Sequence, residues 1–331
     1  MDIYEKIVDY FSGIPCVDTW GEVQALFKRI GSMKPRHWML PVRSCQAVGG
    51  TSDQAIPAAV AVACCHTSII LVDDMLDADP RGEYHRISMP AAANMACAFQ
   101  AAGLEAIACS EAEPSAKMLA LRSMNRMTLT TTLGQSWDVQ CPADEAAFWR
   151  VVKTKSSPFF GAALEIGALL GRGPAEIAGR LNELGRLYGE MIQIHDDLND
   201  ALEVPANPDW TSGRSSLPLL FAQVVDHPDR QRFLELRKEA SDPEKLAEAQ
   251  TILIRCGAIS YGVDQLVRRY QQSRTILDSI PLVKREELDS LLDEVINPVK
   301  KMFSALGMAQ VSLPPSSVRL DAGISGGSNP T

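Results

Sequence analysis

The sequence predicts an all-α protein that folds as a single domain. Helical periodicity runs through most of the chain, whereas the alternating pattern of a strand is scarce. The breaks in this periodicity fall at Pro, Gly or Asp/Ser/Pro clusters, which end helices. A composition of 46% hydrophobic and 22% charged residues over 331 positions supplies one large core. We therefore expect a helical bundle around a central cavity.

The expected helices follow one another from residue 2 to residue 306. Gly49 and Gly50 end the third, a Gly-Pro turn at 171–174 separates two others, and a polar loop at 205–216 precedes the last group. The helix over 52–77 is apolar on nearly every side, which is typical of a buried central helix. The Ser/Gly/Pro-rich residues 308–331 predict a disordered tail after a domain over 1–307. The expected helical ranges are 2–12, 18–31, 38–48, 52–77, 90–109, 115–134, 144–155, 158–170, 175–202, 217–225, 229–239, 243–256, 259–278 and 284–306.

Charge and cysteine content argue against several classes of protein. The net charge of −9 and the pI of about 5.2 come without a basic stripe, which argues against nucleic acid as a partner. The eight cysteines show no C-x-x-C spacing, so we expect free thiols in a reducing compartment, with Cys64, Cys65 and Cys97 buried. The sequence has no apolar signal segment and no uninterrupted apolar run of about 18 residues. We expect a cytoplasmic protein without a transmembrane segment.

Two aspartate clusters with one spacing carry the expected chemistry. Each follows an apolar run and places carboxylates at i, i+1 and i+4, so that members three and four apart share a helix face. These carboxylates repel one another unless a cation lies between them, and their hard oxygens suit Mg²⁺, which bridges to substrate phosphates. The two clusters together predict a cage for a diphosphate held through magnesium. Its six expected ligands are Asp73, Asp74, Asp77, Asp196, Asp197 and Asp200.

Five motifs in order resemble those of the trans-isoprenyl diphosphate synthase (polyprenyl synthetase) family over roughly residues 20–300. The two clusters resemble its Asp-rich motifs, the second as Gln193-Ile194-x-Asp196-Asp197-x-x-Asp200. Gly134-Gln135-x-x-Asp138 resembles its GQxxD, and Lys153-Thr154 resembles its KT. Asp209-x-x-x-Gly213-Arg214-x-Ser216-Leu217-Pro218 resembles its DLxxGKxTLP, with Arg for Lys and Ser for Thr. The resemblance implies an isoprenoid synthase-type helical bundle, three Mg²⁺ ions (or Mn²⁺ in their place), and often a homodimer.

The resemblance also implies a reaction in which an allylic prenyl diphosphate is ionised. Magnesium neutralises the leaving group, and Lys or Arg assists at the phosphate oxygens. Lys153 and Arg214 are the candidates for that assistance, and Thr154, Gln135 and Gln193 belong to the expected substrate site. The cation left behind needs a dry apolar cavity, which the helices supply, and aromatic faces help to stabilise it.

One basic motif of the resembled family is missing. Its GGKRxRP is replaced by Ser32-Met33-Lys34-Pro35-Arg36-His37-Trp38, where only Lys34 and Arg36 can stand in. The paired arginines after the first cluster are reduced to Arg81 followed by Gly82. Arg81 and Arg86 either balance local acidic charge or reach a second phosphate. One of the two lysines after the second cluster has no counterpart. Because these pieces belong largely to the family's isopentenyl diphosphate site, we expect isopentenyl diphosphate to be a poor substrate.

The allylic chain is expected to be C15, C20 or longer. On the helix before the first cluster, residues four, five and eight positions upstream of its first aspartate point down the pocket. These residues are Ile69, Ser68 and Cys65, and none of them is aromatic. In the resembled family an aromatic side chain near these positions closes the pocket. The alternative is that another helix fills the space, with Phe99 or Met95.

Three functions are open at this point. The first is a prenyltransferase of this family whose acceptor differs from isopentenyl diphosphate. The second is a terpene cyclase on the same scaffold, in which the substrate's own double bonds trap the cation. The third is a non-catalytic partner subunit, against which the six clustered aspartates argue. The second motif keeps aspartates where class I cyclases carry an Asn/Ser/Glu motif, which favours prenyl transfer, although the fold does not settle the acceptor.

Overall fold

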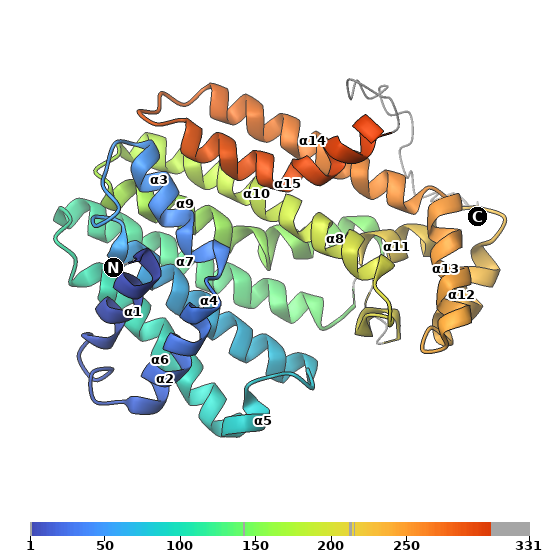
Figure 1. Ribbon diagram of the computed structural model, residues 1–331, viewed down its shortest axis with the longest axis horizontal. Helices are drawn as coiled ribbons and strands as arrows, with labels where there is room; N and C mark the ends of the chain where they lie inside the picture. The colour runs from blue at the N-terminus through green and yellow to red at the C-terminus, as the bar shows by residue number, and fades with distance from the viewer. Residues whose placement is uncertain (1, 142, 212–213, 215, 306–331) are drawn as a thin grey trace, which may run out of the picture. The chain divides into compact units, whose positions relative to one another are not determined.

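The structure, a computed structural model, describes residues 2–141, 143–211, 214 and 216–305. Every regular element in these ranges is an α-helix or a short 3-10 helix (Figure 1), which confirms the all-α prediction. The elements are α1 Ile3–Ser12, α2 Gly21–Ser32, η1 Arg36–Met39, α3 Leu40–Ala47, α4 Ile56–Asp77, α5 Tyr84–Ile87, α6 Met89–Ala108, α7 Pro114–Asp138, α8 Glu145–Thr154, α9 Ser157–Leu170, α10 Ala175–Leu202, η2 Pro208–Trp210, α11 Leu217–Val224, α12 Arg230–Lys238, α13 Pro243–Arg255, α14 Ala258–Asp278 and α15 Glu286–Ala305.

The expected helices agree with the observed ones except near their ends. The helix expected over 115–134 continues to Asp138, so the whole Gly134-Gln135-x-x-Asp138 motif lies on α7. The loop after the first aspartate cluster contains the single-turn helix α5, and the polar loop before α11 contains η2. The expected tail over 308–331 lies outside the described residues, and so does Gly213 of the DLxxGKxTLP-like motif.

Spatial contacts divide the chain into two compact units, which are described separately. Unit 1 comprises residues 1–196 and 266–296, and unit 2 comprises residues 197–265 and 297–331. Three helices, α10, α14 and α15, have residues in both units. The expectation of one domain over 1–307 therefore stays a prediction.

Helix α4 is the centre of unit 1 and packs against α1, α3, α6, α9 and η1. By length and composition it is the one helix among the described residues that could cross a membrane. However, 72% of its most apolar window is buried inside the protein, which is typical of a core helix. Beside it, the rings of Phe11 and Phe27 stack with centroids 3.9 Å apart, and Phe99 packs 5.7 Å from Phe11. These aromatic contacts fasten α1, α2 and α6 together over the α4 core.

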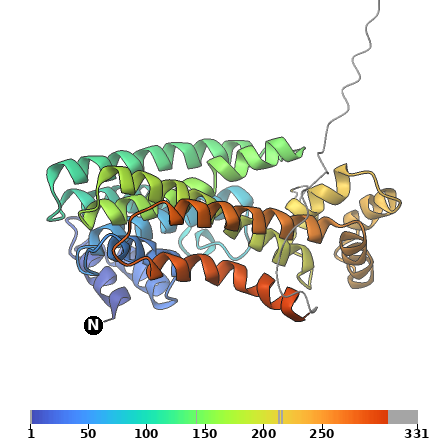
Figure 2. The same cartoon turned by 90° about the horizontal axis from the view of Figure 1, so that it is seen from above.

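Helices α14 and α15 lie side by side within unit 1, as two views of the chain agree (Figures 1 and 2). The Arg274 guanidinium on α14 pairs with Asp289 on α15 at 2.6 Å. Tyr270 donates a hydrogen bond to Asp293 Oδ1 at 3.0 Å. These polar contacts fix the register between the two helices.

Unit 2 has its own core, in which Trp210 and Phe233 are fully buried. Helices α11, α12 and α13 pack against one another around them. Arg237 on α12 donates from Nε to the Trp210 carbonyl and from Nη2 to the Asp209 carbonyl, both at 3.1 Å, and also to the Arg214 carbonyl. One half-buried guanidinium thus binds the carbonyls of Asp209, Trp210 and Arg214, which belong to or lie within the DLxxGKxTLP-like motif.

All eight cysteines are free thiols, as the sequence predicts. Cys64 and Cys65 are buried in α4, but Cys97 is exposed, so its expected burial is wrong. Cys97 lies in an Ala- and Met-rich stretch, and this apolar composition predicts burial. Those small residues occupy both the inner and the outer face of α6, and Cys97 falls on the outer one.

Candidate functional site

The first aspartate cluster occupies the last turn of α4. Asp73, Asp74 and Asp77 are all half-buried, and the helix ends at Ala78, which adopts a left-handed φ of 51° and donates its amide to the Asp74 carbonyl. The C-terminal end of a helix already carries negative partial charge, so three carboxylates there reinforce it. Burial, followed by the charges of Asp79 and Asp73, raises the pKa of Asp74. Negative charge is therefore concentrated at this turn, which favours the binding of a cation.

Lys155 supplies the cation that the structure brings to this cluster. Its ammonium pairs with Asp73 at 3.1 Å and with Asp138, the last residue of the GQxxD-like motif, at 2.6 Å. Burial alone would lower the pKa of Lys155, but the carboxylates of Asp73 and Asp138 outweigh it and raise that pKa. The side chain is only 20% exposed. Two of the family-like motifs thus meet at one charged group.

The close approach of α7 to the end of α8 depends on Gly134. A Cβ at this position would lie 2.3 Å from the Lys155 backbone nitrogen and 2.5 Å from the Thr154 carbonyl carbon. No side chain fits at those distances, so only glycine is sterically possible at this position of the GQxxD-like motif. It lets Asp138, one turn further along α7, reach Lys155.

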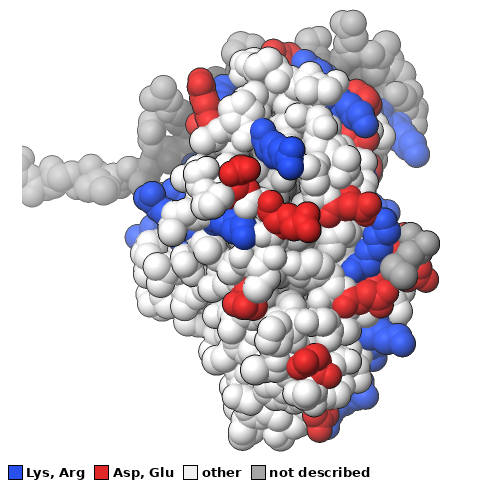
Figure 3. Space-filling model, turned by 90° about the vertical axis from the view of Figure 1, so that its left-hand side faces the viewer, with Lys and Arg blue, Asp and Glu red and all other residues white. Residues whose placement is uncertain are grey.

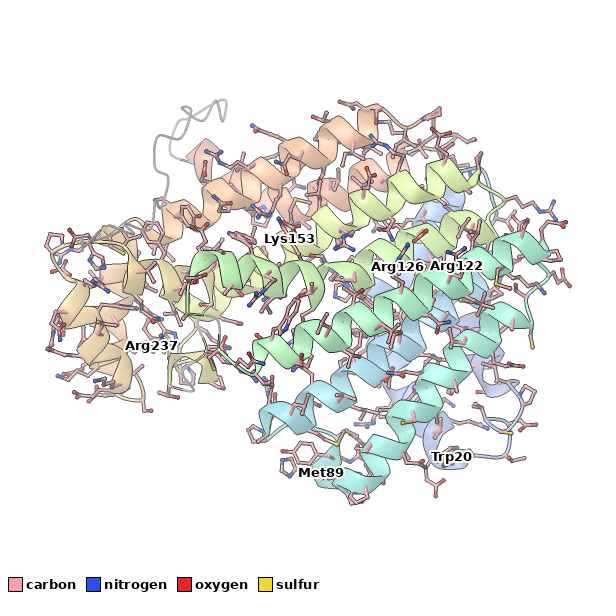
Figure 4. All side chains as sticks on the ribbon, turned by 180° about the vertical axis from the view of Figure 1, so that it is seen from behind. Trp20, Met89, Arg122, Arg126, Lys153 and Arg237 are labelled. Carbon is pink, nitrogen blue, oxygen red and sulfur yellow. The ribbon has the colours of Figure 1, made fainter. Side chains whose placement is uncertain are left out.

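Sequence reasoning chose Lys153 rather than Lys155, and the structure leaves Lys153 exposed on α8 (Figure 4). Thr154 donates its hydroxyl to the Arg150 carbonyl at 2.6 Å, a contact within its own helix. The buried face of α8 consists of Phe148, Val151 and Val152. Lys155 lies seven residues after Phe148 and so continues that inward face. Helical periodicity would have found it where the two-letter motif did not.

The second cluster gives its three carboxylates different surroundings along α10. Asp196 belongs to unit 1, and its side chain is 60% exposed. Asp197 and Asp200 belong to unit 2, where Asp200 is half-buried. Asp197 is buried and accepts a hydrogen bond from the Leu217 amide, the first residue of α11, at 2.7 Å. The N-terminus of a helix favours a carboxylate, so Asp197 also holds α11 in unit 2.

Gln193, one turn before this cluster, is oriented by α9. Ser156, the residue that precedes α9, donates its hydroxyl to Gln193 Oε1 at 2.7 Å. Gln135 on α7 is half-buried, and its Nε2 is a buried donor without a hydrogen-bond acceptor among the described residues. Of the two glutamines expected in the substrate site, Gln193 is thus oriented by a hydrogen bond, and Gln135 has a donor that a ligand could use.

The basic side chains expected near a second phosphate mostly pair with neighbouring acids. Arg81 makes a two-point contact with Asp79, at 3.2 and 3.0 Å. Arg86 pairs with Glu83 at 3.7 Å, and Lys34 pairs with Asp2 at 2.6 Å. Of the two alternatives for Arg81 and Arg86, local charge balance is the one these contacts favour. In unit 2, Arg214 is half-buried in the loop that Arg237 holds.

The residues expected to line the prenyl pocket lie along α4. Cys65 and Ser68 are buried, whereas Ile69 is half-buried. The neighbour of Cys65 is Met127 of α7, with the two sulfur atoms 3.8 Å apart. The aromatic side chain of Phe99 packs instead on Phe11 and Phe27. The residue next to Cys65 is therefore a flexible methionine rather than a ring.

The donor set of the first cluster fits a hard divalent cation. Asp73 Oδ1 is buried and accepts no hydrogen bond, its contact with Lys155 being an ion pair. Carboxylate oxygens with negative charge in excess are what Mg²⁺ takes as ligands. Among the described residues, no three His, Cys, Asp or Glu side chains already converge on one point. The carboxylates fit the metal by chemistry and would have to converge further to hold it.

A separate cavity of about 600 Å³ lies in unit 1, far from the aspartates. It reaches Ile56 and Pro57, the first turn of α4, whereas the cluster occupies the last. That separation corresponds to about 25 Å of helix. Its walls carry both Lys6 and Asp53, which pair at 2.6 Å. Acidic and basic groups are likewise interspersed on the face drawn in Figure 3. This cavity is not the site of the aspartate chemistry.

Sequence comparison links the chain to enzymes of isoprenoid synthesis. The polyprenyl synthetase family profile matches residues 32–253, more than half of the chain. A geranylfarnesyl diphosphate synthase of Aeropyrum pernix is 25% identical over 285 residues, which cover 79% of this chain and 89% of that protein. A short chain isoprenyl diphosphate synthase of Methanothermobacter thermautotrophicus is 29% identical over 239 residues, which cover 67% and 73%.

Solved structures show the same fold. The geranylgeranyl pyrophosphate synthetase of Pyrococcus horikoshii superposes with a TM-score of 0.77 at 22% identity, covering 89% of this chain and 94% of that one. The polyprenyl synthase of Caulobacter crescentus, complexed with calcium and isoprenyl diphosphate, gives 0.73 at 20% identity, covering 89% and 93%. The chain therefore belongs to the polyprenyl synthetase family and is a prenyltransferase of that family.

Proposed function

We propose that this enzyme ionises an allylic prenyl diphosphate of C15, C20 or longer with magnesium and transfers the prenyl group to an acceptor other than isopentenyl diphosphate. The observation that carries the proposal is the half-buried Lys155 between Asp73 and Asp138. A lysine and carboxylates at one site are what a metal-bound diphosphate requires.

The aspartates and Lys155 would both act on the leaving group. The metal-binding set is Asp73, Asp74, Asp77, Asp196, Asp197 and Asp200, and the metal, when bound, neutralises charge on the departing diphosphate. Lys155 holds a proton firmly, because two carboxylates raise its pKa. Of its three donors, Asp73 and Asp138 engage two, so the third would serve a phosphate oxygen while the side chain keeps its charge. Gln193, held by Ser156, and the buried donor of Gln135 would orient polar parts of the substrate.

The pairing of the basic side chains supports the poor use of isopentenyl diphosphate. A second diphosphate needs cations that are free to turn toward it, since each charged group bound to a local acid must first give up that partner. Lys34, Arg81 and Arg86 each have such a partner. Arg36 is exposed and has no partner among the described residues, so it is the one remaining candidate in the replaced motif.

A terpene cyclase is the second candidate. Phe159 and Phe160 at the start of α9, with Tyr188 of α10 packed 5.5 Å from Phe160, provide aromatic faces within unit 1. Such faces stabilise a carbocation. A cyclase would release a hydrocarbon or alcohol from the allylic substrate alone, whereas a transferase requires a second molecule for its product.

We also propose a homodimer, formed through the outer faces of α6 and α7. These helices run side by side at one surface (Figure 4). That surface exposes large apolar side chains, namely Met89, Met118, Leu129 and Leu133. An extended apolar surface of this kind marks an interaction site. Light scattering of the purified protein should give twice the chain mass, and Leu129→Glu should shift it toward the monomer.

The test of the reaction is incubation with C10, C15 and C20 allylic diphosphates and Mg²⁺, with and without isopentenyl diphosphate. Organic extracts are analysed before and after phosphatase treatment. The proposal expects diphosphate release from the C15 or C20 substrate and no elongated prenyl diphosphate. Efficient elongation of a C10 or C15 starter would refute it, and a cyclic product from the substrate alone would identify a cyclase.

A further inference from the structure

Four aromatic rings from three separate elements of unit 1 form a cluster, here called the ring box. His37 comes from η1, His66 from α4, and Phe159 and Phe160 from the start of α9. The His37 ring meets His66 edge-on with centroids 5.6 Å apart and Phe160 at 5.1 Å. His66 lies 5.7 Å from Phe159, and the two phenyl rings are 5.3 Å apart. Each ring thus contacts at least two of the others.

The two imidazoles of the ring box lack hydrogen-bond partners. Nδ1 of His37 and Nδ1 of His66 are both buried, and neither bonds to any of the described residues. The His227 ring in unit 2 also has a buried Nδ1 without a partner, while its Nε2 contacts the Ala222 carbonyl at 2.9 Å, so the feature that sets the ring box apart is the pairing of two such atoms between aromatic rings. Leaving a buried polar atom unpaired costs about 1–3 kcal/mol. Two such atoms side by side indicate a place for a polar ligand rather than a packing contact.

Both imidazoles are neutral at physiological pH. Burial, reinforced by the neighbouring His37, lowers the pKa of His66 to about 4. Burial and the nearby Arg36 lower the pKa of His37, although Asp196 acts in the opposite direction. A neutral imidazole offers one donor and one acceptor nitrogen. No cation belongs to the ring box, so it is poorly suited to a second diphosphate.

The aromatic stack of Phe11, Phe27 and Phe99 shows how a purely structural cluster differs. Its rings are fully buried and carry no polar atom. In the ring box both histidines keep part of their surface exposed, although their Nδ1 atoms are buried. The phenyl rings are fixed from behind, since a Cβ at Gly189 of α10 would lie 2.6 Å from Phe160 Cδ2. The ring box is therefore an aromatic wall in which two partly exposed histidines carry unpaired nitrogens.

The ring box is aligned with the first aspartate cluster. His66 and Asp73 are seven residues apart on α4, which places them on the same helix face and about 10 Å apart along its axis. Asp196, which influences His37, belongs to the same unit. A molecule bound at the ring box would lie near the carboxylates without touching Asp73.

We infer that the ring box is the acceptor site and that it takes a neutral, electron-rich aromatic molecule carrying an O–H or N–H group, such as a phenol or an indole. The inference rests on the proposed function. The aromatic walls stack on the acceptor ring. A neutral imidazole accepts the hydrogen bond from its O–H or N–H group, which satisfies a nitrogen that the protein leaves open.

The transfer itself balances with these residues. The C1–O bond of the allylic diphosphate breaks, and the diphosphate leaves with the electron pair. C1 bonds to a ring carbon of the acceptor, and the proton displaced from that carbon passes to an imidazole nitrogen of His37 or His66. A cation that cyclises must avoid bases until its rings are closed, so two neutral imidazoles favour one transfer followed by proton loss.

Histidine NMR on the full chain tests where the acceptor binds. Protein with isotope-labelled histidine is titrated with indole, with phenol and with isopentenyl diphosphate, each in the presence of Mg²⁺ and an unreactive thiolodiphosphate analogue of the C15 substrate. Indole or phenol should shift the His37 and His66 imidazole signals and leave unchanged that of His85, an exposed ring that lies tilted against Tyr84. Shifts caused by isopentenyl diphosphate alone, or by none of the probes, would overturn the inference.

Variants give a second measurement. His37→Phe and His66→Phe keep an aromatic ring but remove the hydrogen-bonding nitrogens, and each should weaken indole or phenol binding by at least about tenfold. His85→Phe is the matched control and should bind like the wild type. Equal binding by all three variants would contradict the inference.

Diphosphate release from the C15 and C20 substrates, measured in parallel, separates the two claims. Release without indole or phenol binding refutes the ring box as acceptor site and leaves the proposed function standing. Binding at the ring box without release, by contrast, refutes the proposed function.

Discussion

The two aspartate clusters have the same spacing and different surroundings. On α4 the carboxylates of Asp73, Asp74 and Asp77 are all half-buried at a helix end, and Lys155 pairs with the first of them. On α10 the first carboxylate is mostly exposed, while the second is buried and accepts the amide of Leu217. One sequence pattern thus includes a carboxylate that pairs with a lysine side chain and a carboxylate that accepts the first amide of a helix.

This difference follows from the position of each cluster in its helix. The first cluster ends α4, and the chain continues from it as a loop that leads to α5 at Tyr84. The second cluster begins at Asp196, six residues before the last residue of α10. The first amide of α11, that of Leu217, donates to Asp197. The four N-terminal amides of a helix need acceptors, and a nearby carboxylate is a strong one; Asp197 has this role for Leu217, the first residue of α11. Substitutions should therefore separate activity from stability in one cluster and not in the other.

The largest effect is expected at Asp73. Asp73→Ala removes one of the two carboxylates that pair with Lys155 and leaves Asp138 as the other, so the fold should be retained. Loss of one charge interaction with the reacting group typically costs about 10²–10³-fold in turnover. Steady-state kinetics with the C15 substrate measures the loss, and circular dichroism should remain helical. Asp79→Asn is the control, because its carboxylate already pairs with Arg81, and near-wild-type activity in Asp73→Ala would contradict the metal-site reading.

The next largest effect distinguishes Lys155 from Lys153. Lys155→Ala removes the cation between Asp73 and Asp138, and a hydrogen bond to a charged group contributes about 1.5–3 kcal/mol, or roughly 10–100-fold in kcat/KM. Lys153→Ala changes an exposed side chain and should alter kcat/KM less than about threefold. A larger loss of kcat/KM in Lys153→Ala than in Lys155→Ala would support Lys153, as the motif predicts. It would also contradict the role of Lys155 on which the proposed function depends.

The comparison between clusters is tested most directly at Asp197 and Asp196. Asp197→Ala leaves the buried Leu217 amide without its acceptor, which should lower the free energy of unfolding by about 1–3 kcal/mol. Asp196→Ala removes an exposed carboxylate and should change it by less than about 0.5 kcal/mol. Urea denaturation followed by circular dichroism measures both. Equal stability of the two variants would mean that the Asp197 contact contributes nothing to α11.

Local patterns predicted most of the fold, since helical periodicity and helix-breaking residues act over a few positions. The aspartate clusters were also found from spacing alone. Contacts between distant segments were not: nothing in the sequence pairs Asp197 with Leu217 or Arg237 with the Trp210 carbonyl. Lys155 is an intermediate case. It continues the inward face of α8 from Phe148, but the KT-like dipeptide pointed two residues earlier, and two residues along a helix turn a side chain by about 200°.

The smallest effect concerns chain length and compares the helices that lead into the two clusters. Eight and five residues before Asp73 stand the small Cys65 and Ser68, whereas the same positions before Asp196 hold the large Tyr188 and Met191. All four side chains are buried. If the prenyl chain runs along α4, space can be gained there by moving the flexible Met127, which contacts Cys65, but not beside Tyr188, which packs on Phe160.

Ser68→Phe should then shorten the preferred substrate. A phenyl ring in a filled site costs about 1–3 kcal/mol, and a long allylic chain adds to that conflict while a C10 chain does not. The ratio of kcat/KM for C20 over C10 should fall by about tenfold, with circular dichroism checking the fold. Ile254→Phe, at an exposed position of α13, is the control and should leave the ratio unchanged. If Ser68→Phe leaves it unchanged as well, the chain does not run along α4, and the small residues behind the first cluster serve helix packing with α6 and α7 alone.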